Sequence, residues 1–278
     1  VGPRVLKVLT SSHEHSGAID GFNAHPEFEV VTIADELWND HDRLRDLVRS
    51  VEPDIALLSW RTYDLFDRIP CEQFVEIIKD SAPLCWTLVD VAQTVGIEPI
   101  PAVGDVVFGS AHKWLMGPHG TGLMWVGSRA LAELYPFNWG EAFDSESKAW
   151  GFEATGGQNF AAYAGLKIAL ELYRHRGVDE VWRHSSDLAE NFVAEFKKIV
   201  KTPDWQIESK GPVALLHGQG EQVYELYRYL NEADCHAKCI IKPDLGLRLL
   251  RFGFPHYESS RRIKLAVEKI ADYLSQGA

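Results

Sequence analysis

Residues 90–122 have the types and spacing for covalent chemistry on a carbonyl compound. An apolar run ends on Asp90, and a second β-rich run over 105–110 is followed closely by Lys113. A lysine at a strand end, beside a glycine-rich turn at 117–122, can meet a ligand at the carboxyl edge of a sheet. Desolvation there would lower its pKa, as a Schiff-base lysine needs. A carboxylate on a neighbouring strand could hold a pyridinium nitrogen protonated and so make the ring an electron sink.

Alternating β-rich and helical stretches must position these residues. Continuous apolar runs such as 54–59 are typical of strands buried on both faces. The order strand, helix, strand at this spacing predicts a mostly parallel sheet covered by helices. Strands are predicted over 5–10, 28–33, 54–59, 84–90, 105–110, 122–127, 213–217, 237–241 and 247–252. Helices are predicted over 41–51, 72–80, 178–201, 222–232 and 259–275, with one more that begins near 161.

The pattern changes near 135–157, where prolines, glycines and tryptophan interrupt any periodicity, as in a connecting or functional loop. We therefore predict an α/β chain with two domains. The first, 1–160, is a large ligand-binding domain. The second, 161–278, contains connecting helices and a smaller α+β domain.

Composition narrows the class of protein. The 278 residues are 46% apolar and 24% charged, a globular balance, and the net charge is −12. An acidic chain without basic runs is a poor partner for nucleic acid or an anionic membrane surface. No apolar stretch reaches the roughly 18 residues of a membrane span. Four cysteines are too few for a disulfide scaffold, and no signal peptide is recognisable. These features predict a cytoplasmic protein.

The order Asp-x-x-Gln, Asp, Ser-x-His-Lys and Gly-Pro-x-Gly-x-Gly resembles the class V aminotransferase and cysteine desulfurase family of fold-type-I pyridoxal-phosphate (PLP) enzymes. The family's three-layer α/β/α fold, with a mostly parallel sheet, is what this resemblance implies. The chain supplies the pattern with Asp90, Gln93, Asp105, Ser110, His112, Lys113, Gly117, Pro118, Gly120 and Gly122.

The resemblance implies a role for each polar residue of the pattern. Lys113 would form the internal aldimine with PLP, and Asp90 would pair with the pyridine nitrogen. Gln93 would contact the ring oxygen. Ser110 and His112 would hold the phosphate. Taken singly, these residues could instead be a strand cap, a loop residue and a solvated lysine, but their joint order favours the cofactor site.

Two further positions extend the resemblance. Glu14-His15 matches the family's Glu-His step, which implies that His15 stacks on the ring and shuttles protons. The alternatives are a surface histidine or a metal site with His13. A metal site is disfavoured because side chains alternate along a strand and no third ligand is apparent. Residues 152–159 resemble a loop that reaches the neighbouring subunit's phosphate. That implies a homodimer with Thr155 as a phosphate ligand, unless this residue caps a helix.

Near the C-terminal end of the sequence, residues 249–257 resemble a segment of the family in which an arginine binds the substrate α-carboxylate through two N–H donors. Arg251 fits this role better than Arg248, which lies three positions earlier and would face the other side of a strand. A structural ion pair is the alternative for Arg251.

The chain departs from the family in two places outside its cysteines. It begins just before Glu14, without the family's glycine- and threonine-rich helix N-terminus that cradles the phosphate. We therefore expect a fragment or a shortened relative that holds PLP weakly. Tyr63 stands where an asparagine would contact the ring oxygen, and Phe66 replaces a glycine. Tyr63 is thus a predicted substrate-side residue, with Trp60 and Arg61 as further candidates for the changed substrate space.

The cysteines do not match the nucleophile of the desulfurases. Cys235 and Cys239 lie in the expected region, but the Arg-x-Gly-x-x-Cys context is absent. Persulfide formation at Cys239 and a zinc site made of Cys235, Cys239, His217 and His236 are both less favoured than buried, unreactive thiols. We predict no metal site.

These inferences lead to one main function and several alternatives. The main prediction is a PLP-dependent enzyme that acts on an amino acid through an external aldimine, most consistent with a carbon–sulfur lyase. An aminotransferase or an epimerase would share these residues. An inactive, cofactor-free dimeric relative that serves as an interaction module is the alternative from another class. A nucleotide-binding protein is disfavoured because no Gly-x-Gly-x-x-Gly loop follows the first strand.

Overall fold

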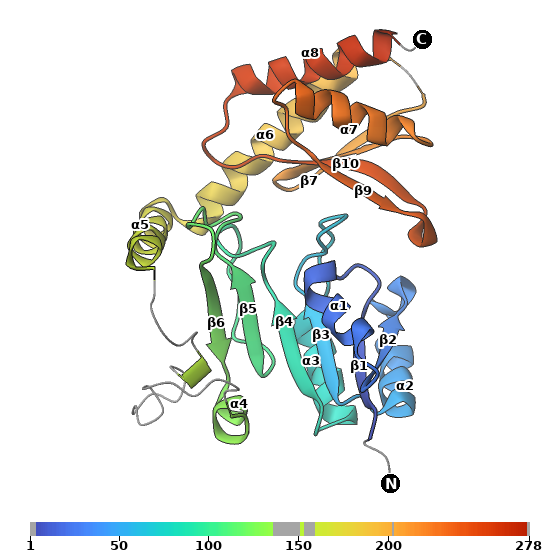
Figure 1. Cartoon of the computed structure of the whole chain (residues 1–278), viewed down its shortest axis with the longest axis vertical. Coiled ribbons are helices and arrows are strands. Elements are labelled where there is room, and N and C mark those ends of the chain that lie inside the picture. The colour runs from blue at the N-terminus through green and yellow to red at the C-terminus, as the bar shows by residue number, and fades with distance from the viewer. Residues whose placement is uncertain (1–3, 136–150, 153–158, 202, 277–278) are drawn as a thin grey trace. The chain divides into compact units, whose positions relative to one another are not determined.

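The computed structural model describes residues 4–135, 151–152, 159–201 and 203–276. Contacts between residues divide the chain into two compact units (Figure 1). The first contains residues 1–63 and 68–174, and the second contains 64–67 and 175–278. The predicted domains, 1–160 and 161–278, stay a prediction. Among the described helices, none is long and apolar enough to cross a membrane.

The first unit is built on a six-stranded sheet in the order β2-β1-β3-β4-β5-β6. The first five strands run parallel to their neighbours, and β6 is antiparallel to β5. The predicted mostly parallel α/β architecture is therefore confirmed. The strands are β1 (Leu6–Ser11), β2 (Phe28–Ile33), β3 (Ile55–Ser59), β4 (Trp86–Asp90), β5 (Val106–Ser110) and β6 (Gly122–Val126).

Helices lie between β1 and β2, β2 and β3, and β3 and β4, whereas the parallel strands β4 and β5 are joined by the turns of residues 91–105. In α2, the side chain of Asp40 caps the N-terminus by accepting from the Arg43 N–H, and Leu44 and Val48 bury one face of the helix. The helix ends where Glu52 adopts a left-handed conformation. The helices of this unit are α1 (Ser16–Ala24), the 3-10 turn η1 (Asp35–Leu37), α2 (His41–Val51), α3 (Cys71–Ser81), α4 (Ser128–Glu133) and α5 (Phe160–Arg176). The division between the units falls within α5.

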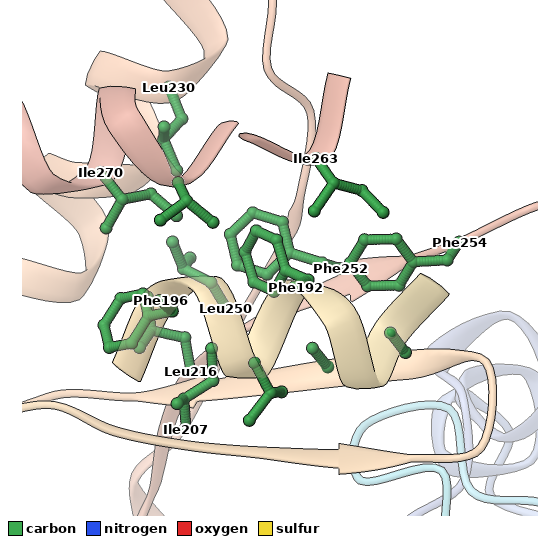
Figure 2. Packing of buried hydrophobic residues seen from close by; sticks show 14 of the residues in the cluster. Phe192, Phe196, Ile207, Leu216, Leu230, Leu250, Phe252, Phe254, Ile263 and Ile270 are labelled. Carbon is green, nitrogen blue, oxygen red and sulfur yellow. The ribbon is translucent and has the colours of Figure 1, made fainter. Parts of the chain in front are cut away.

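The second unit has a four-stranded antiparallel sheet in the order β7-β8-β10-β9. Its strands are β7 (Gln206–Lys210), β8 (Val213–His217), β9 (Lys238–Lys242) and β10 (Leu247–Gly253), with a 3-10 turn, η4 (Pro243–Leu245), between the last two. Its helices are α6 (Val178–Ile199), α7 (Gln222–Glu232) and α8 (Ser260–Gln276). In its core, the Phe192 ring packs 4.9 Å from that of Phe252 and 5.2 Å from that of Phe254 (Figure 2).

Residues 64–67 belong to the second unit because their side chains bond within it. Asp64 is fully buried and pairs with Lys242 at 2.8 Å. Phe66 stacks on Trp182 with ring centroids 6.4 Å apart, and its φ of 60° is a left-handed conformation. Phe66 thus keeps a backbone that suits the glycine expected at this position, and adds a buried aromatic ring.

Among the described α-helices and strands, three are absent from the sequence-based prediction. Helix α1 buries no residue, so it has no apolar stripe by which to recognise it. Helix α4 is only six residues long, and β7 contains more polar than apolar residues. Each lacks the periodic pattern on which such predictions depend.

Candidate active site at the carboxyl edge of the parallel sheet

A cavity of about 1000 Å³ opens in the first unit where the parallel strands end. The strand order reverses between β1 and β3, and crevices for ligands form at such switch points. Strand register places Ser59 opposite Asp90, and Ser110 opposite Gly122. The lining includes seven of the nine predicted site residues: His15, Tyr63, Asp90, Gln93, Ser110, His112 and Lys113.

Asp90 ends β4 and lies in the wall of this cavity. Its Oδ1 accepts a hydrogen bond from the Ala92 N–H at 2.7 Å. Burial raises the pKa of the carboxyl, against the opposing effects of the Ala92 N–H, Lys113 and His15. The carboxylate therefore lies within the electrostatic reach of the predicted lysine, although the two residues are 23 positions apart in the sequence.

His15 caps the N-terminus of α1. Its Nδ1 accepts from the Gly17 N–H at 3.0 Å, which leaves the ring proton on Nε2 when the imidazole is neutral. The ring lies edge-on to Tyr63, with centroids 5.0 Å apart. The expectation that residues 13–15 alternate along a strand is wrong, because β1 ends at Ser11 and these residues form the turn into α1.

Glu14 precedes His15 in the turn after β1, and its side chain is buried. Its Oε1 accepts from the Ser59 N–H at 2.9 Å and from Ser11 Oγ at 3.0 Å, and its Oε2 accepts from Ser59 Oγ at 2.5 Å. Burial raises the pKa of Glu14, and these three donors partly oppose the rise. The bonds fix the turn that carries His15.

The predicted phosphate residues lie at the end of β5. The ring of His112 stacks on that of His119 at 4.6 Å, and burial lowers the pKa of His112, with smaller effects of His119 and Lys113. His112 is therefore a neutral donor near pH 7. Gly109 comes so close to the next loop that a Cβ here would lie 2.9 Å from the Ala92 nitrogen. The backbone of β5 thus packs directly against the loop after Asp90.

The donor set of this cavity fits PLP. An aldehyde needs a primary amine, a pyridine nitrogen needs an acid, and a phosphate needs N–H and O–H donors. Lys113 offers the amine, Asp90 the carboxyl group, and Ser110 and His112 the polar donors. Gln93 is buried at the same edge, beside the Asp90 loop.

The other predicted residues lie elsewhere. Thr155 lies outside the described residues. Arg251 lies in the second unit on β10, half-buried, whereas Arg248 is exposed. Asp105, also part of the motif, binds the N–H and hydroxyl of Thr87 at 2.9 and 2.8 Å before β5 begins, and so stabilises the opposite end of the strand. Trp60 is buried under the guanidinium of Arg68 and is not part of the lining.

The thiols are not activated as nucleophiles. Cys239 lies on β9, Cys235 lies just before it, and burial raises the pKa of both. Burial also raises the pKa of Cys71, and that of Cys85 to about 12. In the part of the chain that the structure describes, no group of three or more His, Cys, Asp or Glu residues could hold a metal ion.

Several lining residues were not predicted from the sequence. Ser59 is the last residue of β3, so its position at a strand end could have identified it. Phe108, Tyr163 and Leu166 also line the cavity, from β5 and α5. Nothing local in the sequence separates these apolar residues from core residues, because only the fold decides which faces a cavity.

Comparison with known proteins identifies the family and the fold of this chain. The sequence model of the family described as aminotransferase class-V matches residues 66–234, more than half of the chain. Two curated relatives, both probable cysteine desulfurases from strains of Xylella fastidiosa, are 33% and 32% identical over 110 residues. Each match covers 36% of this chain and 26% of the relative, so the matched segment spans about a quarter of these proteins.

Solved structures share the fold. An apo cysteine desulfurase from Thermococcus onnurineus superposes with a TM-score of 0.79 at 15% identity, over 99% of this chain and 74% of that protein. A cystine C–S lyase in complex with cysteine persulfide gives a TM-score of 0.80 at 17% identity, over 98% and 76%. The predicted fold class is thereby confirmed. Because the family model matches more than half of the chain, including Asp90, Gln93 and the motif around Lys113, the chain belongs to the aminotransferase class-V family of PLP-dependent enzymes.

Proposed function

We propose that this chain is a PLP-dependent enzyme that acts on an amino acid at the cavity of the first unit. One observation carries the proposal: the fold brings Lys113 and Asp90 into one cavity, at the ends of neighbouring parallel strands. A lysine and an acid in this relation suit the aldehyde and the ring nitrogen of the cofactor. Membership of the class-V family supports the same cofactor.

Each residue has a distinct part in this proposal. PLP, when bound, supplies an electron sink that makes the substrate Cα–H acidic. Lys113 would hold the cofactor by its amine and then accept the Cα proton at Nζ. Asp90 would keep a proton at the ring nitrogen, and its hydrogen bond from Ala92 fixes its orientation. His15 would cover the ring, held by its bond from Gly17. Ser110 and His112 would bind the phosphate, and Thr155 would serve as a phosphate ligand for the neighbouring subunit of a homodimer.

A carbon–sulfur lyase is the reaction that we favour. The curated relatives are probable cysteine desulfurases, and one structural neighbour is a cystine C–S lyase. No cysteine is among the described lining residues of the cavity in the first unit, and burial raises the pKa of all four thiols. We therefore propose release of sulfur by elimination, without an enzyme persulfide. Arg251 would bind the substrate α-carboxylate, and Tyr63 would contact the substrate beside His15.

Trapping of the cofactor tests the proposal directly. Purified protein mixed with PLP should gain a visible absorption band that sodium borohydride removes. Peptide mapping should then place the pyridoxyl group on Lys113. The Lys113→Ala variant should lose the band, whereas Lys167→Ala, which changes an exposed lysine of α5, should keep it.

The alternative of an inactive, cofactor-free interaction module makes the opposite prediction. A cofactor-free interaction module would show no band at any PLP concentration, and no lysine would be labelled. Label on a lysine other than Lys113 would reject the assignment of the site. For the reaction, pyruvate released from an S-substituted cysteine indicates a lyase, whereas exchange of the Cα hydrogen without release of sulfur indicates an epimerase.

A further inference from the structure

Two imidazole rings stack at the end of β5, and the proposed function uses only one of them. The centroid of the His112 ring lies 4.6 Å from that of the His119 ring, with an angle of 26° between the ring planes. His112 lines the cavity, whereas His119 is exposed and is not among the described lining residues. His119 occupies a position that the Gly-Pro-x-Gly-x-Gly pattern leaves open, so the stack is a feature of this chain rather than of the motif.

The glycine-rich turn fixes this stack through its backbone. The Gly117 N–H donates to the Ala111 carbonyl at 2.8 Å, and the Ala111 N–H donates to the Thr121 carbonyl at 3.0 Å. These two bonds lie on either side of His119 in the sequence, and both end on the residue just before His112. They therefore fold the turn back onto the end of β5 and hold one imidazole against the other.

Three basic groups gather at this point: His112, His119 and Lys113. Burial lowers the pKa of His112, and His119 and Lys113 lower it further. Within the described part of the chain, the titratable groups that act on the His112 ring are thus both basic. A proton on His112 would be repelled by a charge on either neighbour, because like charges at this separation oppose each other.

A phosphate group reverses this balance. A phosphate monoester carries a charge of about −1.5 to −2 near pH 7, and a nearby anion favours the protonated imidazole. We propose that the stacked His112–His119 pair takes up one proton from solvent when the phosphate of the cofactor binds, and that His119 is a positioning residue of this site. The inference rests on the proposed function, in which His112 binds the phosphate.

The two parts of the inference act together. The His119 ring holds the His112 ring in place, and repulsion between the two rings keeps the site unprotonated until the anion binds. The phosphate then accepts a charge-assisted N–H bond from an imidazolium, which is stronger than a bond from a neutral ring. By linkage, the affinity for a phosphate monoester rises as the pH falls from about 8 toward about 6.5.

The titration of His112 tests proton uptake directly. Pyridoxine 5′-phosphate is the probe, because it has an alcohol in place of the PLP aldehyde and cannot form a Schiff base with Lys113. The NMR titration midpoint of His112, assigned with the His112→Gln variant, should rise by about one pH unit or more when this probe saturates the protein. Pyridoxine without a phosphate should leave the midpoint unchanged. A midpoint that does not rise, or that rises equally with pyridoxine, would overturn the inference.

Two substitutions separate the charge of His119 from its ring contact. His119→Phe keeps a ring that can stack but carries no charge, and His119→Ala removes both. In the free protein, each variant should raise the His112 midpoint toward the usual 6.5. A merely structural contact would leave that midpoint unchanged in His119→Phe, and this result would remove the charge of His119 from the site.

Affinity for the same probe reports the positioning role. At pH 7, His119→Ala should weaken binding of pyridoxine 5′-phosphate roughly 3- to 10-fold, because the His112 side chain must then be ordered on binding. His119→Phe should recover most of this loss, since it restores the ring contact. His25→Ala, which changes an exposed histidine of the same unit, is the matched control and should bind as the wild type does. An equal loss of affinity in the alanine and phenylalanine variants would overturn the positioning role.

Cofactor trapping distinguishes failure of this inference from failure of the proposed function. A pyridoxyl label on Lys113, combined with an unshifted His112 midpoint, would overturn the inference and leave the proposed function intact. Absence of binding by both PLP and pyridoxine 5′-phosphate would overturn both.

Discussion

Glu14 accepts hydrogen bonds from both the backbone N–H and the hydroxyl of Ser59, at 2.9 and 2.5 Å, across 45 positions of sequence. The two residues lie just after β1 and at the end of β3, the strands between which the chain order reverses. Ser59 lines the cavity and Glu14 precedes His15, so one buried carboxyl group links two sides of the candidate site. The geometry of the cavity depends on this link.

Removal of either partner should therefore destabilise the first unit. Glu14→Ala leaves the Ser59 N–H and two hydroxyls without their acceptor, and we expect a cost of about 3 kcal/mol in the free energy of unfolding. Ser59→Ala removes one donor, and should cost about 1–2 kcal/mol. Urea unfolding at pH 7 measures both.

The double variant gives the control. Once Glu14 is absent, the Ser59 hydroxyl has lost its buried acceptor, so the two costs should sum to more than the cost of the double variant. Strict additivity would contradict the link. A loss of stability in Ser59→Ala as large as that in Glu14→Ala would show that the N–H bond contributes nothing.

The predicted homodimer has a structural basis in exposed apolar side chains. On α5, Phe160, Ile168 and Leu172 are 82%, 58% and 61% exposed. The edge strand β6 also exposes the side chain of Trp125. Such side chains gather where a protein associates. We expect the chain to sediment as a dimer of the 31.3 kDa protomer.

Charged substitutions on α5 should disrupt that dimer. Ile168→Glu combined with Leu172→Glu should shift the mass toward the monomer by at least tenfold in dissociation constant, because two charges would be buried without partners. Leu84→Glu, at an exposed leucine before β4, should leave the mass unchanged. A wild type that sediments as a monomer would reject the homodimer.

Much of the fold follows from local patterns. The predicted bounds of β2, α2, β8 and α7 match the structure residue for residue, because each combines a clear periodicity with an evident boundary. In α2, for example, the capping Asp40 precedes Leu44 and Val48, which lie four residues apart on one face. The approach of Asp90 and Lys113 is also predictable, since parallel strands bring their carboxyl ends to one edge.

Contacts across the sequence were beyond such reasoning. No local pattern pairs Glu14 with Ser59 or Arg61 with Glu98, because the partners are 45 and 37 positions apart and meet only through the sheet order and loop paths. The left-handed backbone of Phe66 was equally hidden, since a bulky residue rarely adopts it. The family's glycine at this position was the only indication, and its replacement by Phe66 was interpreted as a change in the substrate space, not as evidence about the backbone.

Two substitutions of Phe66 separate the cost of its left-handed backbone from the stabilisation that its buried ring provides. It is fully buried against Trp182 at a φ of 60°. Phe66→Ala should cost about 3–4 kcal/mol through the cavity it leaves. Phe66→Gly removes the same ring but tolerates the left-handed backbone, so it should be more stable than the alanine variant by about 1 kcal/mol. Thermal unfolding compares them, and an alanine variant equal to or better than glycine would contradict the strain.

The last prediction concerns the charge of Asp90 in the cofactor-free protein. Burial raises its folded-state pKa above the usual 3.8, so ionised Asp90 is less favourable in the folded chain than in the unfolded one. The stability that the acid form supplies is fully present below pH 3.8 and is lost as pH rises through the folded-state pKa. Asparagine keeps an oxygen for the Ala92 N–H but cannot ionise. Asp90→Asn should therefore be close to the wild type in stability near pH 4 and more stable at pH 8, as urea unfolding at each pH would show.

The same Asp90→Asn substitution should lower the enzymatic activity. The carboxylate that destabilises the folded chain at pH 8 is the group proposed to hold a proton on the PLP ring nitrogen, and asparagine cannot supply that charge. With PLP present, we expect Asp90→Asn to lower kcat roughly 100- to 1000-fold. The charge of Asp90 is also one of the causes that raise the pKa of Glu14, so part of the stability gained by Asp90→Asn at pH 8 comes through Glu14. A variant that is both more stable and fully active would remove Asp90 from the mechanism. A variant that is less stable at pH 8 would show instead that ionised Asp90 is stabilised by Lys113 and His15 more than burial opposes it.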